Sequence, residues 1–272
     1  MTPTPAHLDR VLYVPYHSHT TAHLPLYDIT DEYRATVGDS PVGGSEFKLR
    51  LCVMRKPAWN TFDARVAFHV DVEADGSLLA VEERCLGIGH KVHVRLPSHP
   101  ADETTIQATT PDGKDERQYS VQVTCPVPGR QRGRVTIQYP YFTLTRSDAG
   151  PASVAAPLQW QAYPIEKGAL CYLLVDTRLH AAAGQETPAD EAVRAIYHHA
   201  GMEDELPTRY SEGVLLLPRG QGGALDTLVT SSLLGLLRYD RSFARVAGRR
   251  QSAGRSKLSK VIRRVLGDGV RT

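Results

Sequence analysis

Residues 65–72 read Arg-Val-Ala-Phe-His-Val-Asp-Val, and this stretch decides the fold class. Val66, Phe68, Val70 and Val72 are apolar, and the residues between them are small or polar. A period of two residues is typical of a β-strand with one face on a core and the other toward solvent. The stretch therefore predicts a strand. A helix capped by Thr61 is the alternative interpretation of residues 61–70.

The same alternation recurs on both sides of this stretch, at residues 47–51, 92–96, 119–123 and 135–144. Glycine, proline and aspartate separate these runs and are typical of turns. Five or six short strands joined by turns predict an antiparallel sheet or sandwich.

The pattern changes after residue 150. Residues 170–175 and 213–217 are continuous apolar runs, which predict buried strands. Residues 187–200 begin with Thr-Pro and carboxylates and contain an apolar stripe, which predicts a helix. Residues 224–237 are rich in leucine and predict a second helix. The expected fold class is α+β: a β-rich antiparallel sheet or sandwich followed by a helical C-terminal part.

Three segments follow from these patterns. Residues 1–46 are interrupted by prolines and glycines and are expected to form an irregular N-terminal arm. Residues 47–237 are expected to form the α+β body, which is β-rich over 47–146 and mixed over 165–237. Residues 238–272 form a basic tail that contains a predicted amphipathic helix.

The charge is distributed unevenly along the chain. The net charge is +2, but residues 238–272 carry eleven Lys and Arg against Asp240 and Asp268. The tail therefore has a charge of +9 and residues 1–237 a charge of −7. This asymmetry predicts an anionic partner, either anionic lipid or nucleic acid. A solvated tail without a specific partner is the alternative.

Residues 257–266 have the pattern of an amphipathic helix. Their apolar positions recur at i, i+3, i+4, i+7 and i+8, and basic residues flank that face. Such a helix can lie in a lipid interface with its cations toward the head groups. It can also dock on another protein, follow a phosphate backbone or cover the protein's own core. The predicted membrane-facing residues are Leu258, Val261, Ile262, Val265 and Leu266. The predicted anionic-surface-binding residues are Arg249, Arg250, Arg255, Lys257, Lys260, Arg263 and Arg264.

Motifs of common enzyme classes are missing from the sequence. It contains no GxxxxGK[ST], HExxH or GxSxG, and Gly87-Ile88-Gly89 lacks the later glycine of a dinucleotide loop. We therefore expect no enzyme activity, no catalytic residue and no cofactor. A cysteine–histidine nucleophile stays open, because the sequence singles out no pair.

Neither the cysteines nor the histidines form a metal-binding motif. Cys52, Cys85, Cys125 and Cys171 lie far apart without a CxxC pair, so we expect reduced core thiols.

His17 and His19 are spaced so that a strand would point both rings to one side, and His23 is near. No third ligand is placed by the sequence, so we expect no metal site. His198 and His199 are adjacent on the predicted helix and would diverge.

No window of about 18 apolar residues is present, and Met1 to Arg10 lack the apolar core of a secretory signal. We expect a protein of the cytoplasm or the inner membrane face, not a secreted one.

One resemblance to a known family rests on several short stretches. Residues 47–55 and 62–67 resemble the first strand and following segment of rhabdovirus-type matrix proteins, a family of negative-strand RNA viruses. Lys167-Gly168 and the apolar run after it resemble a later strand, and the helix predicted near 190–200 and the strand at 213–217 come in a compatible order. The chain departs from the family in having no PPxY or P[ST]AP motif and in carrying its basic region at the C-terminal side.

The resemblance implies a structural protein that self-associates, coats the inner face of a membrane and contacts a ribonucleoprotein, without catalysis or a cofactor. Together with the tail, it predicts a non-enzymatic peripheral membrane protein that bridges anionic lipid and possible ribonucleoprotein partners. The alternative is a nucleic-acid-binding module that uses the tail and a face of the sheet.

Overall fold

The fold is taken from a computed structural model. It describes residues 4–18, 20–38, 50, 65–74, 78–83, 91–95, 104–109, 116–124, 130–131, 134–135, 141–146, 157–164, 170–179, 190–199, 210–219 and 225–239.

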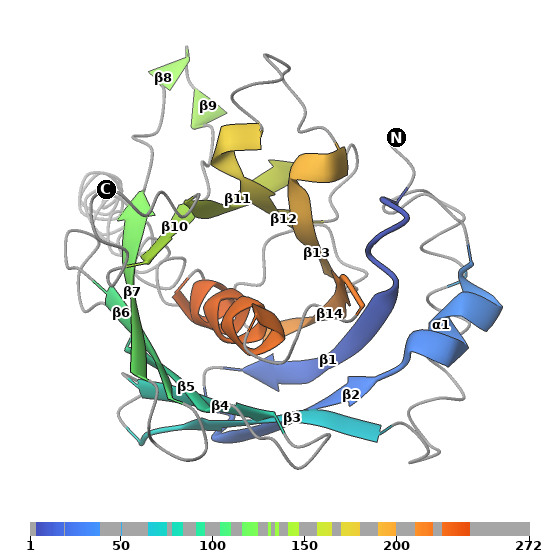
Figure 1. Cartoon of the computed structure of the whole chain (residues 1–272), viewed down its shortest axis with the longest axis horizontal. Coiled ribbons are helices and arrows are strands. Elements are labelled where there is room, and N and C mark those ends of the chain that lie inside the picture. The colour runs from blue at the N-terminus through green and yellow to red at the C-terminus, as the bar shows by residue number, and fades with distance from the viewer. Residues whose placement is uncertain are drawn as a thin grey trace, which may run out of the picture.

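Twelve of the described strands form one closed antiparallel barrel (Figure 1). Each barrel strand pairs with the next one along the chain, and the last pairs with the first. The small hairpin of β8 (Arg130–Gln131) and β9 (Arg134–Val135) is inserted between two of them. The barrel strands are β1 (Arg10–Ser18), β2 (His23–Asp28), β3 (Arg65–Val72), β4 (Leu78–Glu83), β5 (Lys91–Arg95), β6 (Thr104–Thr109), β7 (Glu116–Thr124), β10 (Tyr141–Arg146), β11 (Leu158–Pro164), β12 (Leu170–Asp176), β13 (Val193–His199) and β14 (Tyr210–Leu217).

Pairing between β1 and β14 closes the barrel. Arg10 lies opposite Leu217, and the register continues to Ser18 opposite Tyr210 with an irregularity between Val14 and His17. Closure satisfies the backbone groups that the first and last strands would otherwise expose at the edges of an open sheet. The sheet is therefore a barrel, and the sandwich alternative from the sequence is wrong.

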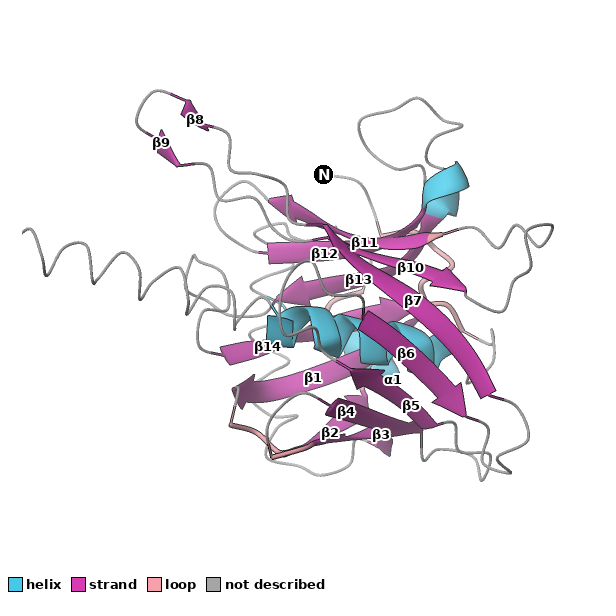
Figure 2. Ribbon diagram, turned by 90° about the vertical axis from the view of Figure 1, so that its left-hand side faces the viewer, coloured by secondary structure: helices cyan, strands magenta, loops and turns pink. Residues whose placement is uncertain are grey.

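Residues 225–239 form a helix that lies inside the barrel, and we call it the central helix (Figures 1 and 2). A helix enclosed on all sides needs apolar or small residues around its whole circumference. The central helix meets this requirement with leucine, valine, serine and threonine. Ser231 and Ser232 each donate a hydrogen bond of 3.0 Å to a backbone carbonyl of the preceding turn, so their buried hydroxyls are satisfied.

The main core lies between the central helix and the inner faces of the strands. The largest fully buried side chains of the protein contribute to it, and Trp160, Tyr172, Tyr197, Phe68 and Phe142 are the aromatic ones.

A second core lies on the outside of the barrel, where α1 (Thr30–Thr36) covers β1 (Figure 1). Tyr33 and Val37 from the α1 region join Val11 and Tyr13 of β1 in this cluster.

The first 38 residues correct the expectation of an irregular arm. They supply β1, β2 and α1, and the two strands are part of the barrel wall. In β1, Leu12 and Val14 belong to the inner core, while Val11 and Tyr13 belong to the outer one. Because both faces are buried, the strand has no polar alternation and its sequence hides the two-residue period.

The predicted helix at residues 187–200 is also wrong over its described part. Asp190–Ala192 is one turn of 3-10 helix, and β13 follows it. Ala195 pairs with Leu174 and Val193 with Val175, so β13 carries one extra residue at this point. This bulge shifts the alternation and places Val193 and Ile196 in the same outer core. A spacing of three residues is helical in appearance, which explains the error.

Other predictions are confirmed. β3, β5, β7, β12 and β14 lie at the alternating or apolar runs that predicted them, and the central helix covers most of the second predicted helix. β10 covers the last four residues of the run at 135–144, and residues 136–140 lie outside the described residues. The fold is therefore β-rich with a few helices, which agrees with the expected β-rich fold class. The strand predicted at 47–51 lies outside the described residues except for Arg50, which has helical conformation.

Gly213 gives the first testable prediction. It pairs with His199, and a Cβ atom there would lie 2.4 Å from the His198 carbonyl oxygen and 2.7 Å from the Tyr197 ring. Replacing Gly213 with alanine is expected to lower the free energy of unfolding by about 1–3 kcal/mol through overpacking. Urea unfolding measures this loss, and Gln107→Ala on the exposed face of β6 should change stability by less than about 0.5 kcal/mol. Equal stability of the two variants contradicts the close approach of β13 and β14.

Candidate functional site

The two ends of the central helix are the candidate sites, because polar side chains gather at each of them. We call the end near Asp226 the amino end and the end near Arg238 the carboxyl end. The first is lined by the start of β1 and the last residues of β2 and β4, and the second by the turn between β1 and β2.

An ionic network occupies the amino end. The Arg10 Nε donates to Asp28 Oδ2 at 3.0 Å, and Arg10 Nη1 donates to Asp226 Oδ2 at 2.6 Å. The guanidinium also lies 5.8 Å from the centre of the Phe68 ring, within the range of a cation–π contact. Asp28 accepts two further hydrogen bonds from Thr30 through its other oxygen. One arginine thus connects β1, β2 and the central helix.

Burial sets the electrostatics of this network. Burial raises the pKa of Asp226, and the charge of Arg10 offsets part of that rise. Burial alone would lower the pKa of Arg10, but the hydrogen bond to Asp28 and the charges of Asp226, Asp28 and Glu83 outweigh it and leave the pKa raised. The arginine stays charged, so the network joins the amino end of the helix to β1 and β2 through ionic hydrogen bonds.

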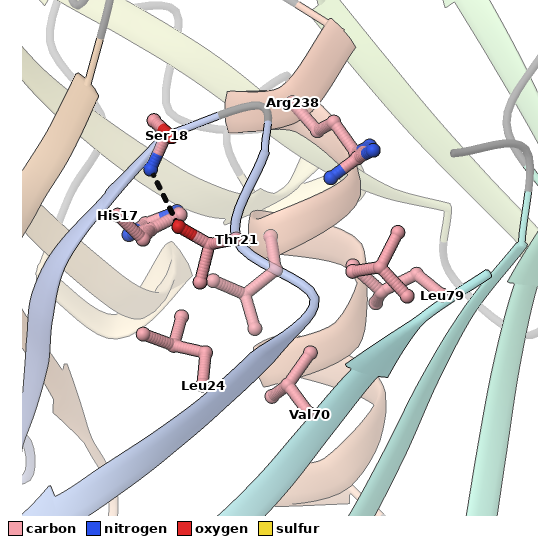
Figure 3. Close-up of a pocket in the computed structure, with 9 residues that line it drawn as sticks. His17, Ser18, Thr21, Leu24, Val70, Leu79 and Arg238 are labelled. Carbon is pink, nitrogen blue, oxygen red and sulfur yellow. Dashed lines mark hydrogen bonds between the residues drawn. The ribbon is translucent and has the colours of Figure 1, made fainter. Parts of the chain in front are cut away.

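The carboxyl end contains a small hollow (Figure 3). Its volume is ≈ 20 Å³, which is room for about one water molecule and too little for a cofactor. Leu24, Val70 and Leu79 form an apolar part, and Arg238 lies at the side of the hollow. The backbone N–H of Ser18 donates to Thr21 Oγ1 at 3.0 Å and shapes the turn above it.

The basic tail begins at this carboxyl end. Arg238 is its first cation, and Tyr239 is buried with its ring centre 5.8 Å from the Phe142 ring centre in an edge-to-face arrangement. A cation in the last turn of a helix is favourable next to the partial negative charge of that end. The predicted lipid-facing and anion-binding residues of 249–266 all lie outside the described residues.

Cys171 and His198 lie opposite each other in the register of β12 and β13. This is a cysteine–histidine pair that the sequence did not single out. Burial raises the pKa of the Cys171 thiol to about 12, which strongly disfavours the nucleophilic thiolate. The pair therefore packs as part of the barrel wall.

His198 and His199 are on a strand and not on the predicted helix, and both are buried. Cys52, Cys85 and Cys125 lie outside the described residues.

The histidines near the N-terminus do not form the pair considered from the sequence. His17 is buried at the hollow, and its Nδ1 lies 2.9 Å from the Pro15 carbonyl oxygen. His19 lies outside the described residues. His23 is exposed on β2 and contacts Asp71 and His69 of β3.

Sequence reasoning missed this cluster of His23, His69 and Asp71, because the partners are 46 and 48 residues away. The sequence feature that could have indicated the cluster is the polar face of residues 65–72, which carries His69 and Asp71. Within the described ranges, no group of three or more His, Cys, Asp or Glu side chains is arranged to hold a metal ion.

None of the helices in the described part of the chain combines the length and the apolar character that crossing a membrane requires.

Comparisons with protein families, curated proteins and solved structures find no match to this chain. The matrix-protein resemblance stays a prediction, and the helix near residues 190–200 that it used is one turn of 3-10 helix followed by β13.

Proposed function

We propose that this chain is a non-enzymatic peripheral membrane protein, in which the barrel carries the basic tail to an anionic lipid surface. The observation that carries this proposal is the position of Tyr239. It is buried at the end of the central helix, and the +9 segment of residues 238–272 begins beside it. The tail is thus continuous with a helix that the barrel encloses.

The central helix is held at both of its ends and along its length. Asp226 is bonded to Arg10 of β1, and Ser232 accepts a hydrogen bond of 2.9 Å from the Trp160 indole of β11. Tyr239 packs on Phe142 of β10. A pull on the tail at a membrane would therefore be borne by the whole barrel, which suits a protein that anchors a body to a surface.

The filled interior supports a role outside the barrel. In the described residues, side chains of the central helix occupy the space where barrels of other kinds hold a ligand. The residues available for partner binding are then those of the outer surface and the tail.

Electrostatics suggest the strength of the proposed contact. Each Lys or Arg near an anionic leaflet contributes about 1 kcal/mol. The seven predicted anion-binding residues of 249–264 would then raise affinity by several orders of magnitude, and the apolar face of residues 258–266 would add to it. The binding should weaken with salt, because exposed charges are screened.

A matrix role would add self-association and contact with a ribonucleoprotein. These two features are what the sequence resemblance implies.

Flotation with vesicles tests the proposal. The full chain should float with phosphatidylcholine vesicles that contain phosphatidylserine and not with pure phosphatidylcholine, and a chain lacking residues 250–272 should float with neither. Unfolding of the barrel should be unchanged by the truncation. Flotation of the truncated chain at the level of the full chain contradicts the proposal.

Two point variants separate insertion from charge attraction. Ile262→Asp is expected to weaken flotation more than Arg271→Ala, because a carboxylate on the apolar face opposes burial in the lipid interface. Equal effects of the two variants count against insertion of that face.

Single-stranded RNA serves as the competing ligand. If truncation abolishes RNA binding and leaves lipid binding intact, the tail is a nucleic-acid-binding element and the membrane proposal is wrong.

A further inference from the structure

The cluster of His23, His69 and Asp71 lies on the outer face of the barrel, between β2 and β3. His23 is opposite Asp71 in the register, and Pro25 is opposite His69. Residues two apart on a strand share a face, so the three polar side chains are on one side of the wall. The inner side of the same strands is apolar, with Leu24 and Val70 buried in the main core.

The contacts within the cluster form a chain from carboxylate to ring to ring. His23 Nδ1 lies 2.6 Å from Asp71 Oδ1, and His23 Nε2 lies 3.3 Å from His69 Nδ1. The carboxylate accepts a hydrogen bond from the Nδ1–H of His23, so the lone pair of the neutral ring is on Nε2. That lone pair is directed toward His69.

The distance between the two ring nitrogens matches a shared metal ion. Two imidazole nitrogens that each lie about 2.0–2.1 Å from a tetrahedral zinc ion are about 3.3–3.4 Å apart. The observed separation of 3.3 Å falls in this range. The ring centroids are 5.3 Å apart with an angle of 34° between the planes, so the rings are tilted and not stacked face to face.

Asp71 has the position of an outer partner of a metal ligand. Histidines that bind a metal through one nitrogen commonly donate the other N–H to a carboxylate, which fixes the ring and raises its basicity. Asp71 is placed to accept the Nδ1–H of His23 at 2.6 Å and to fix the orientation of its ring.

We infer that His23 and His69 form a two-histidine binding site for a divalent transition-metal ion such as Zn²⁺ or Ni²⁺. His23 Nε2 and His69 Nδ1 are the ligands, Asp71 orients His23, and water fills the remaining positions. On binding, neutral His69 takes the tautomer with its proton on Nε2: Nδ1 gives its proton to water and Nε2 takes one from water, so the ring stays neutral and no net proton is released. No electron is transferred. The site has two protein ligands, because in the described residues no group of three or more His, Cys, Asp or Glu side chains is arranged to hold a metal ion.

The site is adjacent to the carboxyl end of the central helix. Thr21 and Val72 line the hollow. His23 comes two residues after Thr21, and Asp71 comes directly before Val72, so the histidine cluster is next to the hollow. The Val72 N–H also donates to the Ala22 carbonyl at 2.9 Å. A metal ion would link β2 to β3 next to the place where the basic tail begins.

Calorimetric titration of the untagged full chain with ZnCl₂ tests the inference. His23→Ala and His69→Ala are each expected to weaken Zn²⁺ binding at least tenfold, because each removes one of two ligands. Asp71→Asn is expected to weaken it about 10–100-fold, as loss of an outer partner does in other metal sites.

His93 is the matched control. It lies on the partly exposed face of β5, opposite Ala80, which in turn is opposite Asp71. Two strand spacings separate it from Asp71, or about 10 Å, which is too far to share the ion. His93→Ala should leave Zn²⁺ affinity within twofold of the parent.

Thermal unfolding supplies a second readout. Zn²⁺ should raise the melting temperature of the parent and of His93→Ala, and not that of the His23→Ala and His69→Ala variants. In EDTA all four should melt alike, which shows that the variants fold. Parent-like Zn²⁺ affinity in His23→Ala or His69→Ala, or an equal loss in His93→Ala, overturns the inference.

Discussion

Replacing Arg10 with methionine is expected to lower the free energy of unfolding by about 3–5 kcal/mol. The change keeps much of the aliphatic volume and removes the charge that contacts Asp28 and Asp226. The Asp226 side chain is only 6% exposed, so its charge would be left in a poorly solvated position. Chemical denaturation at neutral pH, followed by circular dichroism, measures the loss.

The destabilisation should depend on pH in a stated direction. Burial raises the pKa of Asp226 in the folded protein, and Arg10 counteracts this rise. Without Arg10 the folded-state pKa would lie further above its unfolded value. A carboxyl group with a raised folded pKa binds protons more readily when folded, so stability is lost as pH rises between the unfolded and folded pKa values. The cost of Arg10→Met should therefore be largest at neutral pH and should shrink as the pH falls through the folded pKa.

Arg34→Met is the matched control. Arg34 also pairs with an aspartate, Asp9, but the two side chains are 46% and 35% exposed. An exposed pair contributes at most about 1 kcal/mol. The double variant Arg10→Met/Asp226→Leu should be more stable than Arg10→Met, because it no longer buries an unpaired carboxylate. Equal losses for Arg10→Met and Arg34→Met would show that the network at the amino end does not form.

Replacing Trp160 with alanine is expected to cost about 3–5 kcal/mol, as large-to-small changes of buried aromatic residues do. Trp160 is fully buried on β11 between the barrel wall and the central helix. Its indole N–H donates to Ser232 Oγ at 2.9 Å, and Ser232 donates in turn to the Val229 carbonyl. The loss removes packing area and a hydrogen bond between residues 72 positions apart. Equilibrium unfolding in urea measures it.

A double-mutant cycle with Trp160→Phe and Ser232→Ala isolates the contact between wall and helix. Trp160→Phe removes the donor and keeps most of the ring, and Ser232→Ala leaves a buried indole N–H without its acceptor, at a cost of about 1–3 kcal/mol. Because the residues touch, their coupling energy should be about 0.5–3 kcal/mol. Strictly additive losses are incompatible with a helix enclosed by the barrel.

The sequence predicted strands where one face of the sheet is polar. β5 alternates buried and partly or fully exposed positions, and β3 does so from Phe68 to Asp71, so the two-residue period was visible. β1 and β13 have buried side chains on both faces, and β13 also contains a bulge. In these two strands the two-residue period was hidden or resembled that of a helix. The hydrophobic pattern of a sequence shows which face of an element is exposed to solvent, and these strands have no fully exposed face.

The candidate sites were less predictable than the strands. The charge of the tail is a property of composition, and the sequence determined it completely. The Arg10 network and the histidine cluster join residues from distant strands, and their partners depend on the register of each pair. Register is set by the packing of the whole barrel and not by local propensity.

By itself, the sequence determined the β-rich class, the leucine-rich helix before the tail and the separation of an acidic body from a basic end. Only the tertiary structure decided that β14 pairs with β1, that the helix lies inside the resulting barrel, and that His23 meets His69 on its surface. The physical reason is that propensity and hydrophobic period act over a few residues, whereas closure and side-chain convergence are satisfied only when all twelve strands are in register together.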